Sequence, residues 1–465
     1  MQRILRALAV FSVVVSPPGC ARYRPSPLDP KSELAELRGR DLRHVVVDRN
    51  HLALTNAPPT GFRVEDGLDE SEMVAVALTL NPSLRVKRAE IGESQAALIT
   101  AGLWPNPVIG VGVRPGIGGA SGTLVEADAL FDLLRPGERD ARTKAAAATA
   151  DEVNADAVAQ EFKLVGEVRQ QRLAALSADR KIALLKEAVD LRQRALEVLK
   201  RQRELGEAGS LAVSAIELEL AQSHRDLRLA EAELNRECLI LNRLLGLPPE
   251  YPLKISGLGE PLRVTVFDDV GDDELDARLI AGRWELAATE AAYRKAEQEL
   301  RLAVWQQYPR LGIGPAFERE LDGSKSLGVG LSLELPLLDQ GQSRIAQARA
   351  ARERTHAQYT SLLHQLRAEA FEARMLVRAA KAEVDFQEQQ VLPLLQRSQE
   401  LFENAYRARE ISVIDWIAAQ QSAVEARQAF LDASVRYRAA VIGFETATGQ
   451  SLSTMPTISP TTQRE

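Results

Sequence analysis

The sequence predicts a mainly α-helical protein with a small β part, built from two similar halves. Hydrophobic residues make up 45% of the 465 residues but aromatic residues only 5%, a balance that favours long helices packed through small side chains. Two short stretches interrupt the helical periodicity, beginning at Trp104-Pro105 and Tyr308-Pro309. Each alternates glycine or polar residues with apolar ones, which indicates short β-strands.

Matching segments occur in the same order in both halves, which indicates an internal duplication. The pairs are WPNPVIGVGV from 104 with YPRLGIGPAF from 308, LLRPGERDARTKAAA from 133 with LLDQGQSRIAQARAA from 337, and SAIELELAQ from 214 with SVIDWIAAQ from 412. We expect a first structural repeat at 69–246 and a second at 272–449. A connector at 247–271 joins them, and a polar tail follows at 450–465.

The N-terminus has the features of a secretory signal. Basic residues precede the apolar run ALAVFSVVV, and SPPGC follows it, so we expect a signal peptide at 1–19. Cleavage before Cys20 resembles a bacterial lipoprotein site, in which the cysteine sulfur carries a diacylglycerol anchor, and Ala21 suits sorting to the outer membrane. Residues 20–68 would then be a lipid-anchored segment. The alternative is an ordinary signal peptide followed by an incidental cysteine.

The first repeat is expected to contain three helical segments and two strands. Asp69 or Ser71 can cap its first helix, and Asn81-Pro82 should break that helix locally. The turn GEAGSLAV separates the last two helices, and GLPPEYP ends the repeat. The expected elements are a helix at 70–103, strands near 107–115 and 122–132, a long helix at 137–206 and a helix at 213–245.

The second repeat is expected to have the same order of elements. Pro393 lies inside its long helix and should kink that helix rather than end it. The turn REIS then precedes the last helix. The expected elements are a helix at 272–307, strands near 311–319 and 325–336, a long helix at 341–409 and a helix at 413–449.

The helix lengths predict long antiparallel hairpins. A helix of about 70 residues spans roughly 105 Å at 1.5 Å per residue, and two helices of about 35 residues match it when stacked end to end. Each half is therefore expected to form two antiparallel rods. The strands should lie at one end of the rods, and the turns near 206–212 and 409–412 at the other.

Each of the four strand segments has one apolar and one polar face. In SLGVGLSLELP, for example, Leu327, Val329 and Leu331 alternate with glycine and serine. This pattern is typical of a transmembrane β-barrel, although a half-buried soluble sheet produces it too. Four strands cannot close around a pore, and an open edge is not stable in lipid. A membrane-spanning interpretation therefore requires several chains to share one barrel.

Composition and motifs argue against several classes of function. The net charge of −7 disfavours nucleic acid as a partner. No uninterrupted apolar run reaches the length of about 18 residues that a transmembrane helix needs. The five histidines are scattered, and no catalytic constellation or phosphate-binding loop is present in the sequence. We expect no enzyme activity, no cofactor and no metal site.

These features together resemble the TolC-type outer membrane factors, the exit ducts of tripartite efflux and secretion machines. The resemblance covers residues 65–450 and depends on the duplication, Asn81-Pro82, AGLWPNP and SVIDWIAAQ. It also depends on Gly137 and Gly341, which follow the second strand of each half. AGLWPNP and LELPLLDQGQ are most similar to the heavy-metal-cation branch of that family.

The resemblance implies a homotrimer in the bacterial outer membrane. Three chains would each contribute four strands to a twelve-stranded transmembrane barrel, and their duplicated hairpins would form a helical barrel extending into the periplasm. The distal turns would contact a periplasmic adaptor, which links this passive duct to an inner-membrane pump. The adaptor contacts would be Glu207, Ala208, Gly209, Ser210, Arg409, Glu410, Ile411 and Ser412.

Carboxylates on the strands are candidates for the lumen of the barrel. They alternate with the apolar positions, so they should face away from lipid. The alternative is that they only hydrate a polar wall. The candidates are Glu126, Asp128, Glu318 and Glu334.

Three carboxylates beyond the distal turns, Asp415, Glu217 and Glu219, are candidates for a periplasmic gate. In a threefold assembly each becomes a ring of carboxylates that attracts cations. The family carries two aspartates three residues apart here; Asp415 matches the first, but Ala418 replaces the second. Glu217 aligns with Asp415 across the duplication and would complete a mixed ring. The alternative is a helix-start acid stabilised by the helix dipole.

Two other functions are alternatives to the exit duct. One is a structural periplasmic coiled-coil lipoprotein without transport activity, and the other is a periplasmic adaptor, for which no lipoyl-like hairpin domain is visible. A protein that leaves the outer membrane only with detergent would favour the duct. The transported cargo, whether a metal cation, a drug or a polypeptide, stays open at this stage.

Overall fold

The computed structural model describes most of the chain. The described residues are 23–44, 66–115, 122–260, 267 and 269–449. The predicted signal peptide at 1–19, the predicted lipid attachment at Cys20 and the predicted tail at 450–465 lie outside them. The chain divides into two compact units, Met1–Asp41 and Leu42–Glu465.

The first unit contains one described helix, α2 (Pro30–Arg38). Asp29 precedes it in an extended conformation, and its carboxylate accepts a hydrogen bond of 3.1 Å from the backbone N–H of Lys31. This N-cap, together with a proline in the first turn, starts the helix.

The second unit contains the described strands and the long helices. Its elements are η1 (Leu42–His44), α3 (Glu70–Leu80), α4 (Pro82–Gly102), β1 (Val108–Pro115), β2 (Thr123–Leu133), α5 (Glu138–Glu204), α6 (Ser210–Leu244), α7 (Asp272–Gly282), α8 (Trp284–Trp305), β3 (Arg310–Arg319), β4 (Lys325–Glu334), α9 (Gln342–Phe386), the π-helical turn η3 (Gln387–Val391), α10 (Leu392–Arg407) and α11 (Val413–Thr448). The predicted mainly helical fold with a small β part is confirmed.

The predicted features at the start of the first repeat are confirmed. The carboxylate of Asp69 caps α3 by accepting a 2.8 Å hydrogen bond from the backbone N–H of Glu72. Asn81 is extended and separates α3 from α4. Its side chain caps α4 and also donates a 2.8 Å hydrogen bond to the carbonyl of Leu244. The break thus also ties α4 to the end of α6.

Two helix boundaries differ from the prediction. The single helix expected at 272–307 is divided into α7 and α8 at Arg283, which is extended. The guanidinium of Arg283 donates a 2.9 Å hydrogen bond to the carbonyl of Ala447 in α11, so a tertiary contact sets this break. Helix α6 starts at Ser210, before the expected 213.

The long helix of the second repeat is interrupted where Pro393 was predicted to kink it. Proline has no N–H to donate, and its ring crowds the carbonyl four residues earlier. The π-helical turn η3 lies immediately before the proline. At its end, the N–H of Leu392 donates a hydrogen bond to the carbonyl of Gln387. The helix then continues as α10.

The four strands form one antiparallel sheet in the order β1-β2-β3-β4. The register pairs Val113 with Val125, Glu126 with Glu318, and Leu311 with Leu333. Within the described residues, the outer edges of β1 and β4 have no strand partner.

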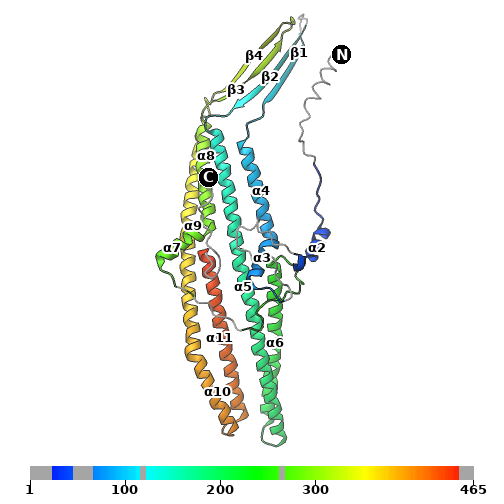
Figure 1. Ribbon diagram of the computed structural model, residues 1–465, viewed down its shortest axis with the longest axis vertical. Coiled ribbons are helices and arrows are strands. Elements are labelled where there is room, and N and C mark those ends of the chain that lie inside the picture. The colour runs from blue at the N-terminus through cyan, green and yellow to red at the C-terminus, as the bar shows by residue number, and fades with distance from the viewer. Residues whose placement is uncertain (1–22, 45–65, 116–121, 261–266, 268, 450–465) are drawn as a thin grey trace. The chain divides into compact units, whose positions relative to one another are not determined.

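The helices of the second unit form an open row. Helix α5 packs against α4, α6, α8 and α11, and α9 packs against α8 and α11. Beside the sheet the row therefore runs α4–α5–α8–α9, with α4 and α9 at its ends. Within this unit the sheet lies at one end of the helices, and the turns that follow α5 and α10 lie at the other (Figure 1). None of the described helices is both long and apolar enough to cross a membrane.

Three apolar clusters hold this unit together. The first packs α3 on α5 and the end of α6, around Met73, Val168 and Leu241. The second packs α7 on α9 and α11. The third lies near the distal turns, where residues of α5, α6 and α11 meet around Leu199.

An ion-pair network joins three helices near the middle of the unit. The guanidinium of Arg169 in α5 contacts Glu70 at 2.7 Å and also pairs with Glu445 of α11. The Glu445 side chain is only 3% exposed. Arg172, one turn further, donates a 2.8 Å hydrogen bond to the carbonyl of Ser256. The network fixes α3 and α11 to the same part of α5.

Candidate functional site

One face of the sheet is apolar and largely exposed. The pairs Val111↔Ala127 and Phe317↔Leu327 place apolar residues of neighbouring strands side by side. Val111 is 70% exposed and Leu327 is 80% exposed. Soluble surfaces rarely carry an apolar patch of this extent, so this face requires an apolar environment. It consists of Ile109, Val111, Val113, Val125, Ala127, Ala129, Phe131, Leu133, Leu311, Ile313, Phe317, Leu327, Val329, Leu331 and Leu333.

The carboxylates proposed for the lumen share the other face. Glu126 and Glu318 are direct cross-strand partners, and Asp128 lies two residues along the same strand as Glu126. Glu334 is at the end of β4, opposite Arg310. The sheet therefore gathers three of the four predicted carboxylates and leaves Glu334 apart.

The alternating glycines of β1 make room for these carboxylates. A Cβ on Gly110 would lie 2.4 Å from Oδ1 of Asp128, and one on Gly112 would lie 3.0 Å from Oε2 of Glu126. A side chain at either glycine would force the neighbouring acid to move. The glycines thus let the carboxylates of β2 lie over the neighbouring strand.

Three charged residues of this face were not predicted. Arg114 contacts Glu126 at 3.1 Å, and Arg310 lies 3.6 Å from Asp132. Asp132 continues the two-residue alternation of Glu126 and Asp128, so the sequence did contain its signal. The two arginines lie close to strand ends, where the alternation stops. The polar face is therefore mixed in charge, with more carboxylates than guanidinium groups.

The two distal turns have the same backbone geometry. After α5, the N–H of Glu207 bonds to the carbonyl of Gln202 at 2.8 Å, and Gly206 has φ +78°. After α10, the N–H of Glu410 bonds to the carbonyl of Ala405 at 2.9 Å, and Arg409 has φ +62°. Both are Schellman-type helix ends, which place a left-handed residue just after the helix.

The residues predicted to contact the adaptor lie on these turns. Most are exposed, whereas Ala208 and Ile411 are half-buried. Two exposed leucines that flank the first turn were not predicted, Leu205 at 74% and Leu211 at 84%. Neither leucine belongs to a run of large apolar residues at three- and four-residue spacing, which is the pattern that predicts a buried helix face. The first turn thus presents both charge and apolar surface.

Each predicted gate carboxylate already has a partner within the chain. Asp415 forms a capping box with Ser412, whose hydroxyl donates to it at 2.7 Å. Glu217 contacts Lys200 at 3.1 Å, and Glu219 lies 3.6 Å from Arg192. The helix-start role of Asp415 is therefore present in this structure.

The structure corrects the alignment of Glu217 with Asp415. Helix α6 begins four residues after Gly206, and α11 begins four residues after Arg409. Counted from these equivalent turns, Asp415 corresponds to Ala212. Glu217 lies five residues further along its helix, about 7.5 Å at 1.5 Å per residue. The alignment from the sequence was wrong because it paired residues of similar type. It did not pair the residues that occupy equivalent positions in the two turns.

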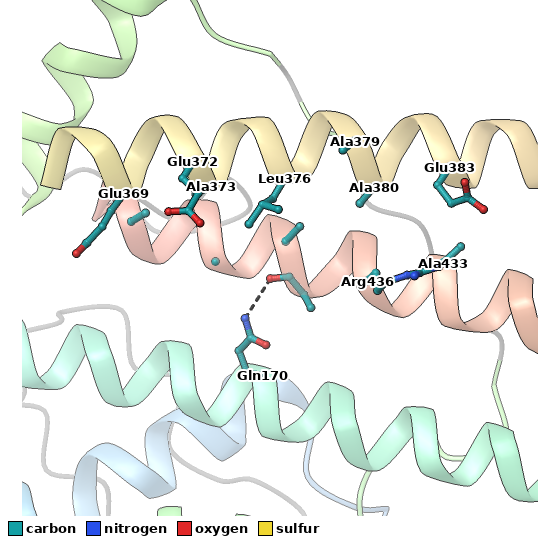
Figure 2. A pocket seen from close by; sticks show the side chains of 14 residues that line it. Gln170, Glu369, Glu372, Ala373, Leu376, Ala379, Ala380, Glu383, Ala433 and Arg436 are labelled. Carbon is teal, nitrogen blue, oxygen red and sulfur yellow. Dashed lines mark hydrogen bonds between the residues drawn. The ribbon is translucent and has the colours of Figure 1, made fainter. Parts of the chain in front are cut away.

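An open groove of about 950 Å³ runs between α9 and α11. Its walls carry small residues such as Ala373, Ala380 and Ala433, so the two helices leave space between them. Gln170 of α5 reaches its edge and donates a 3.0 Å hydrogen bond to a backbone carbonyl of α11 (Figure 2). Its lining contains the carboxylates of Glu369, Glu372 and Glu383 but a single guanidinium, that of Arg436.

The part of the chain that the structure describes contains no group of three or more histidine, cysteine or carboxylate side chains arranged to hold a metal ion. The predicted lumen and gate carboxylates lie on the sheet and near the distal turns instead, and three further carboxylates line the groove.

The chain was compared with known proteins at three levels. No family model matches it. No curated protein sequence matches it either. Solved structures do match, at low sequence identity.

Three of these structures illustrate the match. A membrane protein from Pseudomonas aeruginosa is 19% identical, with a TM-score of 0.68 over 82% of this chain and 92% of that one. CusC, described as forming a transmembrane channel, is 18% identical, with a TM-score of 0.68 over 83% and 93%. The CmeC outer membrane channel of Campylobacter jejuni is 15% identical, with a TM-score of 0.70 over 87% and 92%.

Each of these matches covers more than four fifths of this chain. The chain therefore has the fold of the TolC-type outer membrane channels, and the resemblance predicted from the sequence is confirmed at the level of the fold.

Proposed function

We propose that this protein is the outer membrane exit duct of a tripartite efflux or secretion system. The observation that carries this proposal is the sheet, which has one wide exposed apolar face, one charged face and two unpaired edges. An apolar face on one side and a polar face on the other is the construction of a barrel in lipid. The fold shared with outer membrane channels supports the same conclusion.

The barrel is completed by three copies of the chain. Unpaired strand edges are not stable in lipid, and β1 and β4 can satisfy each other only between copies. The helix row ends at α4 on one side and at α9 on the other, and in the chain α4 leads into β1 and β4 leads into α9. A head-to-tail contact of this kind forms a ring when the rotation between neighbouring copies closes, and the fold shared with outer membrane channels favours that outcome. Three chains then give twelve strands over a continuous helical barrel.

Cargo passes from an adaptor and an inner-membrane pump into the distal end of this duct. The two distal turns are the docking tips, because they are exposed and lie at the end away from the sheet. Replacing 207–210 and 409–412 should stop export while leaving trimer formation and insertion intact. Normal export from that variant would show that the two turns are not the docking site.

The periplasmic entrance carries carboxylates at two levels. Asp415 lies in the first turn of α11, and Glu217 and Glu219 lie further along α6. Threefold symmetry repeats each of them, so protonation or a multivalent cation should relieve their mutual repulsion. The three carboxylates of the groove and those of the sheet also favour cations. The entrance is therefore expected to select cations.

The N-terminus anchors the duct as a second attachment. Changing Cys20 to serine should abolish acylation but leave the barrel inserted, because twelve strands hold it without lipid. Mass spectrometry of the mature N-terminus tests this anchor. A mature protein without a diacylglycerol mass would contradict it.

Planar bilayer recordings test the proposed function. We expect the purified protein to form cation-selective pores that low concentrations of di- or trivalent cations block from the periplasmic side. Asp415→Asn combined with Glu217→Gln should weaken selectivity and block, whereas Glu231→Gln, an exposed α6 carboxylate away from the turn, should change neither. A protein that never conducts would favour the alternative of a structural lipoprotein. If the double variant keeps the selectivity and the block of the unsubstituted protein, the gate lies elsewhere.

A further inference from the structure

The segment that leads from the sheet back to the helices occurs twice, once after β2 and once after β4, and its contacts differ between the two. After β2, the segment Leu133–Gly137 packs against the end of α8 in the other repeat. The guanidinium of Arg135 donates a 2.7 Å hydrogen bond to the carbonyl of Tyr308. The backbone of Gly137 lies against Trp305, since a Cβ there would be 2.7 Å from the indole ring. We name this contact the internal joint.

The second occurrence has no such contact within the chain. The duplication places Leu337–Gly341 in the position of Leu133–Gly137, and Trp104 in the position of Tyr308. Leu337 is 76% exposed and Leu338 is 98% exposed. Such exposure is unusual for two consecutive leucines that lie three and four residues after the end of an edge strand.

The surface equivalent to the end of α8 is also uncovered. Leu103 is 59% exposed and Trp104 is 58% exposed, at the end of α4 that leads into β1. This surface and Leu337–Leu338 lie at opposite edges of the sheet, on its helix-proximal side. They cannot meet within one chain, but they come together when β4 of one copy pairs with β1 of the next.

We infer that Leu337–Gly341 of each copy packs on the Leu103–Trp104 surface of the next copy, repeating the internal joint between chains. This inference rests on the proposed trimeric duct and names the contact that closes it below the barrel. The second copy is chosen as the occupant because the chain itself contains the template for the contact.

The charges at the two surfaces support this joint. In the position of Arg135 the second repeat has Asp339, which cannot donate to a carbonyl. Arg139 lies over the Trp104 ring, 5.9 Å from its centroid, and supplies positive charge on the receiving surface. Asp339 lies 3.6 Å from Arg344 of its own chain and would also face Arg139 of the next copy. In the internal joint, Arg135 donates a hydrogen bond to the carbonyl of Tyr308. In the joint between copies, the opposite charges of Asp339 and Arg139 would take the place of that bond.

Thiol cross-linking in outer membranes tests this joint. The variant carries Leu103→Cys with Leu338→Cys and is treated with a short bismaleimide. We expect dimer and trimer bands on a denaturing gel. The matched control joins Leu338→Cys with Leu211→Cys, a leucine 84% exposed at the distal turn, and should give no such bands. Burial raises the pKa of the half-buried Cys238 thiol, so the native cysteine should react slowly, which the unsubstituted protein verifies.

A second variant distinguishes the joint from insertion of these leucines into lipid. Leu337→Ser with Leu338→Ser should reduce the fraction of trimer that survives heating in detergent. Unchanged trimer survival together with absent cross-links, in a protein that is still trimeric and conducting, would overturn the joint and leave the proposed function intact. A single-chain mass in detergent would overturn both.

Discussion

At the scale of single residues, the distal turns place different residues in one backbone conformation. Gly206 and Arg409 are both left-handed, but an L-residue other than glycine loses about 1 kcal/mol there. Arg409→Gly should therefore stabilise the protein by about 1 kcal/mol. Thermal unfolding followed by circular dichroism measures this as a higher midpoint.

Two glycines of the first turn provide the matched control for this prediction. A Cβ on Gly206 or on Gly209 would meet nothing within 4 Å, so only the backbone conformation distinguishes them. Gly206→Ala should lower the midpoint more than Gly209→Ala does, because Gly209, the N-cap of α6, has φ −80°. Equal effects of the two alanines would show that conformation is not the cause.

The pair Arg169–Glu445 gives a second prediction at this scale. Its side chains are only 15% and 3% exposed, so replacing Glu445 leaves the poorly solvated guanidinium of Arg169 with Glu70 as its remaining partner in this network. Glu445→Gln should destabilise the fold by about 3 kcal/mol, seen as a lower unfolding midpoint. Asp190→Asn, which breaks an exposed pair with Arg194 on α5, is the control and should have little effect. Similar midpoints for both variants would contradict a role for burial.

At the scale of elements, the π-helical turn before Pro393 is expected to be the weakest part of the α9–α10 helix. Pro393→Ala restores an N–H donor and removes the ring clash. Hydrogen exchange of the amides at 387–392 should become slower, while that of the amides at 366–371 in α9 should stay the same. Unchanged exchange at 387–392 would mean that packing, and not the proline, sets the π-helical turn.

The sequence predicted elements well where local chemistry determines them. Asp69 and Asn81 end or start helices through their own side chains, and the strand alternation of Glu126 with apolar neighbours is visible without a structure. The break at Arg283 depends on the carbonyl of Ala447, far away in the sequence, so no local signal marks it. The alignment of Glu217 with Asp415 was wrong for a similar reason. Which residues of the two turns correspond to each other depends on backbone conformation, which residue types do not show.

The candidate site was only partly visible in the sequence. Alternation identified the carboxylates of the sheet, but not that Glu126 and Glu318 are direct partners, because register between strands depends on the whole sheet. The groove between α9 and α11 was not predicted either. Alanines such as Ala373 indicate close helix packing in a sequence, and only the helix positions show that a space remains.

At the scale of the whole molecule, a single chain is incomplete. Its sheet has two open edges and an exposed apolar face, and its helix row ends at α4 and α9. The two open edges and the two ends of the helix row lie on the same two sides of the unit, so one head-to-tail contact satisfies them, whereas the apolar face needs an apolar solvent. Association and membrane insertion are thus expected to occur together.

The mass of the protein extracted from outer membranes tests this central claim most directly. Light scattering in detergent, with the detergent contribution subtracted, should give three times the chain mass of 51.0 kDa. Extraction should require detergent, because we propose that the apolar face lies in lipid. A monodisperse single chain that still inserts into bilayers and conducts would contradict the account.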